Sequence, residues 1–245
     1  MKVTFLGTGD GVPSKERYCS SAIVEVNGST YMIDAGAPVL DLMLRYGKDL
    51  NALKAIFLTH HHGDHCDGLL SLLDLCSWSF RETDFDIYAT EQRVIDKFTE
   101  LTDIVADLFA SKRLRFHLGH EGLVYEDENV KITYFPTLHC HPRPSYAILV
   151  EAEGKKVLFS GDLSNYLQRE DFPKYVLENH VDLFIMEFAH FSTEHVIKYL
   201  PLVKTDKLYI NHITPRFFKD AEELCASNSL PYSTTIACDG DVIDL

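Results

Sequence analysis

The stretch FLTHHHGDHCDGLL, residues 57–70, places four histidines and two aspartates between two apolar runs. A turn from a buried strand into a helix needs only small polar residues such as Gly, Asn or Ser. Imidazole nitrogens and carboxylate oxygens are ligands of zinc, and also of iron or manganese. The H-x-H-x-D-H spacing therefore predicts metal ligands at His60, His62, Asp64 and His65, more than a single catalytic ion needs and enough to begin two adjacent sites.

Short apolar runs alternate with helical patterns along all 245 residues, and Gly and Pro punctuate the joints. Many strands with fewer helices favour an α/β sandwich in which helices face two sheets. We expect strands at 2–6, 22–26, 30–34, 54–59, 86–89, 130–135, 145–151, 156–160, 182–187, 207–211 and 234–237. We expect helices at 38–46, 65–78, 91–110, 171–179, 193–202 and 215–228.

Four apolar runs, KAIFLT, KKVLFSG, DLFIM and KLYIN, each end at or beside a polar residue of ligand type. Runs without a polar face are typical of strands buried on both sides. In open α/β sheets, ligands bind beyond the carboxyl ends of such strands. The pattern therefore predicts that one sheet edge gathers four side chains, namely His60, Asp162, Glu187 and His212.

These segments together resemble the metallo-β-lactamase-fold hydrolases. HHHGDH (60–65) is similar to the signature of that superfamily, and TLHCHPRPSYAI (137–148), LFSGDLS (158–164) and LYINHITPRF (208–217) resemble its later motifs in the same order. The resemblance implies a four-layer αββα sandwich formed as one domain over residues 1–245. It also implies two divalent metal ions, with zinc first and manganese or iron as alternatives.

The resemblance distributes the ligands between the two ions. His60, His62 and His141 would hold the first, Asp64, His65 and His212 the second, and Asp162 would bridge them. His141 is selected because the third histidine of the family stands four residues before a triplet that resembles Ser145–Tyr146–Ala147, and His139 is the alternative. His61, between two ligands, should point away.

FLGTGDGVPSKERYCSS (5–21) resembles the opening of ribonuclease Z and of related small phosphodiesterases. Its Gly-rich turn can bring backbone close to the metals. Lys15, Arg17 and Ser145 are the candidate substrate contacts, although Lys15 and Arg17 can also be read as exposed loop charges. In MEFAHFSTEH (186–195), His190 resembles the histidine that assists proton transfer, oriented by Glu187. His190 and Asp64 are thus the candidate catalytic residues, with a helix-capping turn as the alternative reading of the His190 segment.

Net charge and chain layout separate this sequence from a typical tRNA-binding enzyme. The formal charge is −14, whereas tRNA contact depends on neutralising phosphates. Residues 91–115 suggest a helix with a short basic end, Lys112, Arg113 and Arg115, and not the Gly- and Pro-rich arm of ribonuclease Z. A small phosphodiester is therefore favoured over an RNA 3′ end, and a broad nucleic-acid surface is not expected.

Other activities remain open on the same site. A thioesterase or lactonase would need an acyl-sized pocket, whereas cations such as Lys15, Arg17, Arg143 and Arg216 would favour phosphate. A metal-binding sensor without turnover is a third alternative.

The remaining composition bears on compartment and partners. Six cysteines lack any C-x-x-C pair, which suggests free thiols. Cys66 and Cys140 each adjoin a histidine, so they either line a site or fill the core. Neither a signal peptide nor a membrane span is apparent in the sequence. A cytoplasmic location is therefore expected, and a homodimer is compatible with the sequence.

Overall fold

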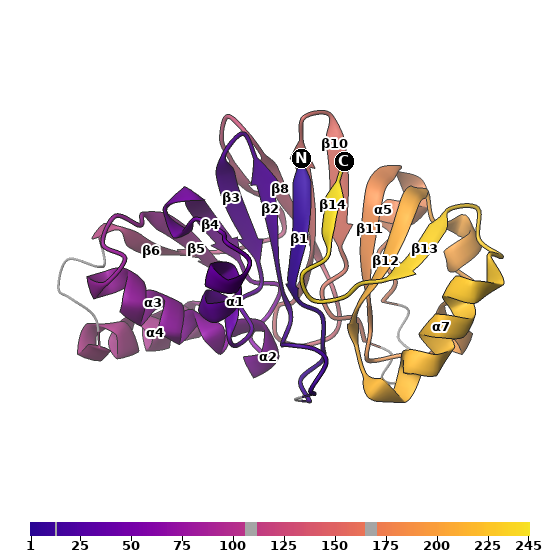
Figure 1. The fold of residues 1–245 in the computed structure, drawn as a ribbon, viewed down its shortest axis with the longest axis horizontal. Coiled ribbons are helices and arrows are strands. Elements are labelled where there is room, and N and C mark those ends of the chain that lie inside the picture. The colour runs from indigo at the N-terminus through magenta and orange to yellow at the C-terminus, as the bar shows by residue number, and fades with distance from the viewer. Residues whose placement is uncertain (13, 106–111, 165–170) are drawn as a thin grey trace.

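The structure is a computed structural model that describes residues 1–12, 14–105, 112–164 and 171–245. Two sheets face each other at its centre (Figure 1). The first contains, in spatial order, β14 (Val242–Asp244), β1 (Lys2–Gly7), β2 (Ser21–Val26), β3 (Ser29–Ile33), β4 (Leu53–Phe57), β5 (Phe85–Ala89) and β6 (Leu114–Leu118). The second contains β13 (Ser233–Ile236), β12 (Thr205–Ile213), β11 (Val181–Phe188), β10 (Lys155–Phe159), β9 (Tyr146–Ala152), β8 (Lys131–Pro136) and β7 (Gly122–Glu126).

Each sheet is antiparallel on one side and parallel on the other. In the first sheet, β3, β4, β5 and β6 run parallel, and in the second, β10, β11, β12 and β13 do. The parallel strands β4, β10, β11 and β12 are the ones whose sequences lead into the expected ligands. The parallel halves therefore supply the strand ends from which the site is built.

Helices cover the outer face of each sheet (Figure 1). Over the first sheet lie α1 (Val39–Arg45), α3 (Gly68–Trp78) and α4 (Gln92–Val105), with the short α2 (Gly63–Cys66) leading into α3. Over the second lie α5 (Tyr175–Glu178), α6 (Thr193–Val196) and α7 (Phe218–Ser227). Short 3-10 turns occupy Leu50–Ala52, Leu200–Leu202 and Pro215–Phe217.

Three apolar clusters hold these layers together. The central one joins the two sheets through residues such as Phe5, Phe57, Ile148 and Ile185. Each outer cluster packs one sheet against its helices, for example Ile56 against the residues of α1 and α3, and other side chains of β10–β12 against α5–α7. The expected four-layer αββα sandwich is thus confirmed.

The predicted elements differ from the observed ones mainly where strands are short or half exposed. The strands β6, β7 and β14 were not predicted, because β6 followed a helical pattern and β7 has no fully buried position. The predicted helix 65–78 divides into α2 and α3 at Asp67. The predicted helices 171–179 and 193–202 shrink to α5 and α6, and the end of the predicted helix 91–110 lies outside the described residues.

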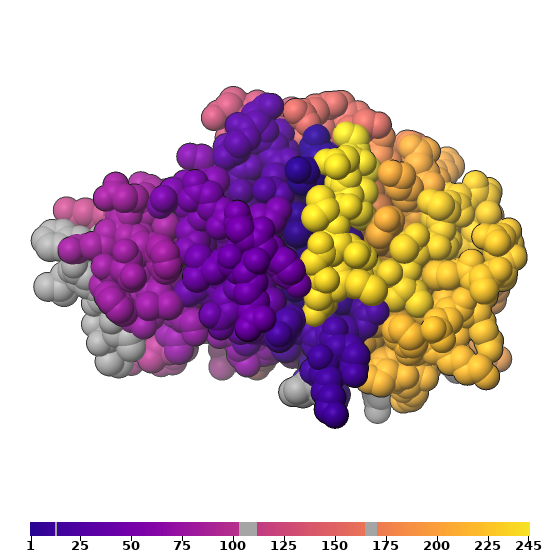
Figure 2. Space-filling model, viewed as in Figure 1, coloured from indigo at the N-terminus to yellow at the C-terminus, as the bar shows by residue number. Residues whose placement is uncertain are grey.

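The first loop and the last strands are fastened to each other. The Asp239 carboxylate accepts hydrogen bonds from the Thr8 amide (2.8 Å), the Thr8 hydroxyl (2.6 Å) and the Tyr18 amide (2.7 Å). In Figure 2 the indigo loop after β1 projects below the yellow C-terminal segment. The described part of the chain contains no helix with the length and apolarity needed to cross a membrane.

Candidate metal centre

The loop after β4 carries the first two expected ligands. His60 is fully buried, and its Nε2 lies 3.1 Å from Nδ1 of His62, with the two rings edge to face. His62 precedes α2, which carries Asp64 and His65. Because α2 begins immediately after the loop, the motif residues His60 and His62 lie in the loop, and Asp64 and His65 lie in the first turn of the helix.

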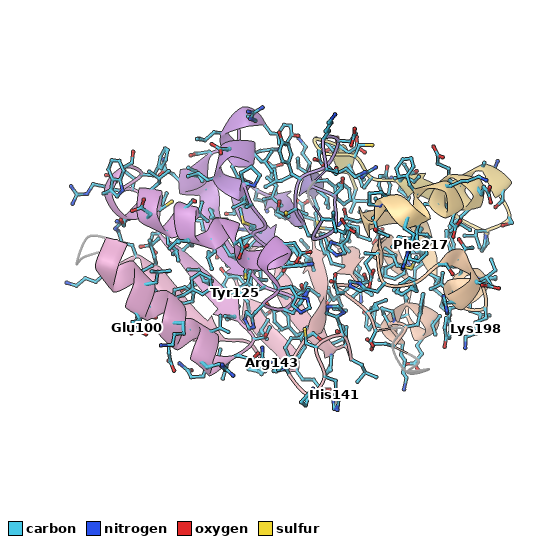
Figure 3. All side chains as sticks on the ribbon, turned by 90° about the horizontal axis from the view of Figure 1, so that it is seen from below. Glu100, Tyr125, His141, Arg143, Lys198 and Phe217 are labelled. Atoms are coloured by element: carbon cyan, nitrogen blue, oxygen red, sulfur yellow. The ribbon has the colours of Figure 1, made fainter. Side chains whose placement is uncertain are left out.

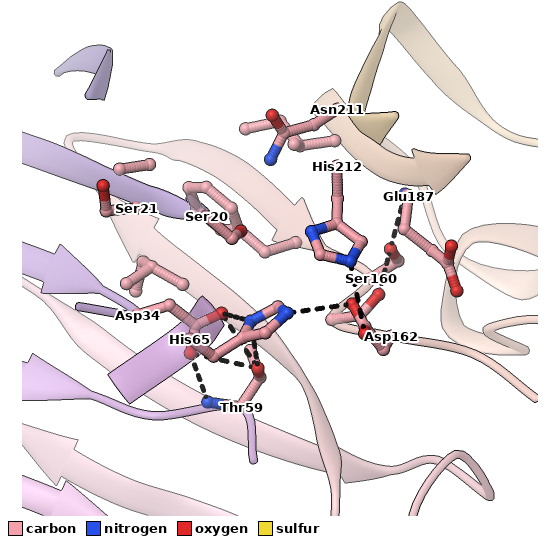
Figure 4. A pocket seen from close by; sticks show the side chains of 15 residues that line it. Ser20, Ser21, Asp34, Thr59, His65, Ser160, Asp162, Glu187, Asn211 and His212 are labelled. Atoms are coloured by element: carbon pink, nitrogen blue, oxygen red, sulfur yellow. Dashed lines mark hydrogen bonds and ion pairs between the residues drawn. The ribbon is translucent and has the colours of Figure 1, made fainter. Parts of the chain in front are cut away.

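His65 is oriented by a buried carboxylate that the sequence analysis did not single out. Asp34 accepts a hydrogen bond from Nδ1 of His65 (2.7 Å) and from the amide (2.8 Å) and hydroxyl of Thr59 (Figure 4). This contact leaves Nε2 of His65 to face the centre, the arrangement that fixes a ligating imidazole. Asp34 also ends an apolar strand, β3, so the strand-end rule could have found it.

Asp162 lies between the loops from both sheets. Its Oδ2 is 3.6 Å from Nε2 of His60 and 3.4 Å from Nε2 of His212, and its Oδ1 is 3.4 Å from Nε2 of His65. The preceding residue, Gly161, has φ +56°, and a Cβ there would lie 2.4 Å from the carbonyl oxygen of Tyr146. Glycine is therefore required for the chain to turn Asp162 toward the centre.

His212 lies in a β-bulge of β12. Glu187 of β11 pairs with Asn211, whereas the next residue, Phe188, pairs with Ile213, so His212 is the extra residue. It has φ +46°, and bulges of this kind re-aim side chains beside active sites. Its Nε2 lies 3.7 Å from Oδ2 of Asp64. Figure 4 shows His212 pointing from β12 toward Asp162 and His65.

The described residues form four overlapping groups of donor atoms, in each of which the atoms lie within 4.8 Å of one another. We call His60, His62, His139 and Cys140 the first donor group, and Asp64, His65 and His212 the second. The other two groups, His60–His65–Asp162 and His139–Asp162–His190, link them through Asp162. Oδ2 of Asp162 lies within 3.6 Å of both. Nε2 of His65 and Oδ1 of Asp162 are buried and, among the described residues, have no hydrogen-bond partner. Such orphaned nitrogen and carboxylate atoms suit divalent cations.

His141 was expected as the third histidine ligand, with His139 as the alternative. The structure brings His139 to the centre, with Nε2 3.1 Å from Nδ1 of His62 and 3.5 Å from Oδ2 of Asp162. His141 is exposed and stands outside both donor groups (Figure 3). The turn explains the difference, because the His141 amide donates to the carbonyl of Leu138 (3.1 Å) and the chain reverses between the two histidines. The structure thus favours the alternative, His139.

Ser145, expected to contact substrate, is buried and shapes this turn instead. Its hydroxyl oxygen accepts from the Thr137 hydroxyl (2.7 Å) and from the Cys140 amide (3.3 Å). The Leu138 amide donates to Asp171 (2.6 Å), which also accepts from the Ser164 amide (2.9 Å). Asp171, missed by the sequence analysis, therefore joins the two loops that carry His139 and Asp162.

His190 lies beside Asp162 and Glu187. Its Nδ1 is 3.0 Å from Oε1 of Glu187 and 3.8 Å from Oδ2 of Asp162, and about a third of its side chain is exposed. Burial alone would lower the pKa of His190, but the hydrogen bond and charge of Glu187 outweigh it and raise that pKa to about 9. Glu187 is itself fixed by the amides of Leu163 and Ala189.

The other expected contacts are placed as follows. Arg17 donates to the Thr8 hydroxyl (2.5 Å) and the Ala237 carbonyl (2.6 Å), so its guanidinium is engaged in holding the loop. Lys15, Arg143 and Arg216 are exposed. His61 points away from the donor groups, as expected, and accepts from the Thr90 amide (3.1 Å).

The basic run at residues 112–115 forms structural contacts. Arg113 donates to carbonyls of Thr83 and of the α3 residues Cys76 and Ser77. Arg115 pairs with Asp84 and Asp86. The expected helix end is wrong here, because Arg115 lies in β6 and Arg113 directly precedes it. Both arginines are engaged in contacts within the fold.

The electrostatics of the centre suit cations. Burial would raise the pKa of Asp162, but the neighbouring imidazoles of His212, His65 and His60 outweigh it and hold that pKa well below its usual range. Burial lowers the pKa of His60 well below its usual value, so its nitrogens are free of a second proton. For His65, the charges of Asp162 and Asp34 overcome burial and raise the pKa well above the usual value. Cations binding here would therefore displace protons.

Sequence comparison relates the chain to known proteins. The family model described as Anti-Pycsar protein Apyc1 matches residues 1–224. Ribonuclease Z from Shouchella clausii (strain KSM-K16) is 33% identical over 163 residues, 63% of this chain and 49% of that protein. Ribonuclease Z from Cyanothece sp. (strain PCC 7425 / ATCC 29141) is 32% identical over 135 residues, 54% of this chain and 42% of that protein. The chain spans about half the length of the curated relatives it matches.

Solved structures extend the likeness over the whole chain. The metallo-β-lactamase fold protein YhfI from Bacillus subtilis superposes with a TM-score of 0.79 at 20% identity, covering 99% of both chains. The short form of human tRNase Z (ELAC1) superposes with a TM-score of 0.76 at 22% identity, covering 100% of this chain and 99% of that one. The chain therefore belongs to the Anti-Pycsar protein Apyc1 family, has the metallo-β-lactamase fold, and is similar in sequence to ribonuclease Z over part of its length.

Proposed function

We propose that this chain is a dinuclear metal-dependent phosphodiesterase that acts on a small nucleotide, a cyclic phosphodiester or an RNA 3′ end. The observation that carries the proposal is the position of Asp162, whose Oδ2 lies within 3.6 Å of histidines from both donor groups. One carboxylate oxygen that reaches two sets of ligands suits a bridge between two ions. The ribonuclease Z relatives support phosphodiester chemistry.

The chain's own residues would set the geometry and move the proton. Two divalent ions held here would lower the pKa of water and offset the negative charge on a phosphoryl group. Asp34 and Glu187 fix the orientations of His65 and His190. His190, oriented by the contact of its Nδ1 with Glu187, would donate a proton to the leaving oxygen of the substrate. Asp64 would act as a ligand of the second ion beside this group.

The Gly-rich loop is placed to limit the size of the substrate. A Cβ on Gly11 would lie 3.3 Å from the Asp64 carboxylate, so the loop backbone passes directly beside the second donor group. Lys15 stands exposed on the same loop, where it can meet a phosphate. The acidic chain, with a net charge of −14, favours a small substrate over a long polyanion.

Zinc is the ion that we propose first, because imidazole-rich donor sets suit it. A cytoplasmic location belongs to the same proposal, and its support is the set of free cysteines, which fits a reducing compartment.

Assays of the metal-loaded protein test the proposal. The substrates are bis(p-nitrophenyl) phosphate, a cyclic nucleotide and a 3′-extended RNA, with a thioester and a lactone as competing chemistries. We expect phosphodiester cleavage that is abolished in Asp64→Ala and Asp162→Ala and retained in Asp206→Ala, a surface control that pairs with His180. Cleavage of the thioester or lactone without any phosphodiester would overturn the proposal.

The proton-transfer role of His190 is tested separately. His190→Ala should lower kcat by about 10²-fold, the range for a lost general acid, while the bound metal stays constant. An unchanged kcat would assign the residue to structure alone.

A further inference from the structure

Cys140 adjoins the first donor group in a way that the proposed ligand set leaves unexplained. Its sulfur is one of four donor atoms, with nitrogens of His60, His62 and His139, that all lie within 4.8 Å of one another. The thiol is half-buried and forms no disulfide. Imidazole nitrogens and cysteine thiolates are both ligands of zinc in proteins.

The turn that selects His139 also fixes Cys140. The Cys140 amide donates to the buried hydroxyl of Ser145 (3.3 Å), and the Cys140 carbonyl accepts from the Arg143 amide (2.9 Å). The turn is closed at its base by the Thr137 amide, which donates to the Ser145 carbonyl (2.8 Å). The backbone on both sides of the thiol is therefore tied down, so its approach to the histidines does not depend on a free loop.

The spacing of the donors is close to that of neighbouring ligands around one zinc ion, to which Asp162 adds an oxygen donor. Two nitrogens each about 2.1 Å from such an ion lie about 3.4 Å apart, and a sulfur at about 2.3 Å lies about 3.6 Å from each nitrogen. The nitrogen pairs His60–His62 and His62–His139 are both at 3.1 Å. Every donor lies within 4.8 Å of the others, so each sulfur–nitrogen distance exceeds the value expected around one ion by at most about 1.2 Å.

We propose that Cys140 is a further side-chain ligand of the first ion, beside His60, His62, His139 and the bridging Asp162. This inference rests on the proposed function, because it needs that ion. A thiolate donor favours zinc over manganese or magnesium, so Cys140 would bias the first site toward zinc. The second group, with one carboxylate and two imidazoles, keeps fewer protein donors and would bind its ion less tightly.

Substitution with Co²⁺ detects a thiolate ligand by its absorption spectrum, so no activity assay is needed. The metal-free protein is titrated with Co²⁺, and the near-ultraviolet band of a thiolate–cobalt bond is recorded. We expect the band in the wild type and in Cys225→Ser, a half-buried thiol on α7 that serves as the control. We expect its loss in Cys140→Ser. Its loss in Cys66→Ser, whose thiol contacts the His62 carbonyl, would overturn the proposal in favour of that cysteine.

Two further measurements test whether Cys140 binds zinc, and the first uses only the wild type, so it does not depend on the folding of Cys140→Ser. In the wild type, bound Zn²⁺ should protect Cys140 from maleimide, as shown by peptide mapping, while Cys225 stays equally reactive with and without metal. Competition with a chromogenic chelator should show zinc bound at least about tenfold less tightly by Cys140→Ser. Equal labelling of Cys140 with and without zinc would overturn the inference.

The outcomes separate this inference from the proposed function. Cobalt bound with a spectrum of nitrogen and oxygen donors alone would refute Cys140 as a ligand and leave the dinuclear site standing. A wild-type protein that binds no cobalt would refute both.

Discussion

At the scale of single residues, His139 and His141 show how a turn decides which of two similar side chains reaches a site. The two histidines are separated only by Cys140, yet His139 lies against His62 and Asp162 whereas His141 is exposed. The turn is held by hydrogen bonds of Ser145 and Asp171, so a different turn direction would break these partly buried contacts.

This placement predicts different fates for two single variants. His139→Ala should lose at least one bound ion per chain, because it removes a nitrogen that lies 3.1 Å from Nδ1 of His62. His141→Ala should retain the metal content of the wild type. Metal-to-protein ratios after dialysis against a weak chelator measure both, with unfolding curves as a check on folding. Metal loss in His141→Ala but not in His139→Ala would show that His141 is the ligand, as the sequence spacing predicts.

Most of the candidate ligands could be predicted from the sequence, because each lies at or near the carboxyl end of a strand or begins a helix. His60, Asp162 and His212 are in that class, and the structure brings them together around one centre. His139 could not be selected because the loop 137–145 has no periodicity, and side-chain direction there depends on turn hydrogen bonds. Asp34 could have been predicted, since it ends an apolar run as the others do.

At the scale of elements, the site depends on how strands end. β10 stops at Phe159, and the chain then turns sharply through Ser160 and Gly161 to present Asp162. The turn passes so close to β9 that a side chain on Gly161 would meet the Tyr146 carbonyl at 2.4 Å and Cβ of Thr59 at 3.2 Å. The loop before His60 is thus packed against the loop before Asp162.

Gly161→Ala should therefore damage the metal centre, and Gly154→Ala is its matched control. Both glycines have positive φ, but a Cβ on Gly154 would meet nothing within 4 Å. The backbone strain of about 1–2 kcal/mol is common to both variants, whereas the clash belongs to Gly161 alone. We expect Gly161→Ala to lose bound metal and at least about 1 kcal/mol more stability. Equal effects in chemical unfolding and metal analysis would show that the close approach is relaxed in solution.

The strands and helices that build the site were predictable, whereas peripheral elements were not. The sequences of β4, β10 and β11 are mostly apolar, and in the structure most of their residues are buried. β7 is half exposed along its length, so its sequence carries no clear alternation between buried and exposed positions. β14 has three residues and pairs only through β1, a long-range contact that no local pattern records.

At the scale of the whole molecule, the two sheets must keep their relative position for the donor groups to meet. The central apolar cluster does most of this, and a polar contact adds to it. Asp127, which follows β7, accepts hydrogen bonds from the hydroxyls of Tyr31 on β3 (2.5 Å) and Tyr125 on β7 (2.8 Å). It also accepts from the amides of Asn129 and Val130. One carboxylate thus ties the second sheet to the first.

This contact predicts an acid-dependent part of the stability. Burial alone would raise the pKa of Asp127, but the four hydrogen bonds outweigh it and hold that pKa below its usual value. A depressed pKa means that the ionised carboxylate stabilises the folded state above the unfolded pKa of about 3.9, and that this contribution is lost as the pH falls through the folded pKa. Asp127→Asn should therefore be less stable than the wild type by about 1–2 kcal/mol at pH 7.

The difference between the two proteins should shrink as the pH falls below about 4, because the wild-type carboxylate then takes up a proton and loses its advantage over the amide. Urea unfolding of both proteins at pH 7 and at a series of values down to about pH 3 measures it. Tyr125→Phe is the companion variant, since it removes one donor that belongs to the second sheet and leaves Tyr31 in place. It should lose less stability than Asp127→Asn at neutral pH. A constant gap between wild type and Asp127→Asn at every pH would mean that the charge of Asp127 adds nothing to the joint between the sheets, which would then rest on apolar packing alone.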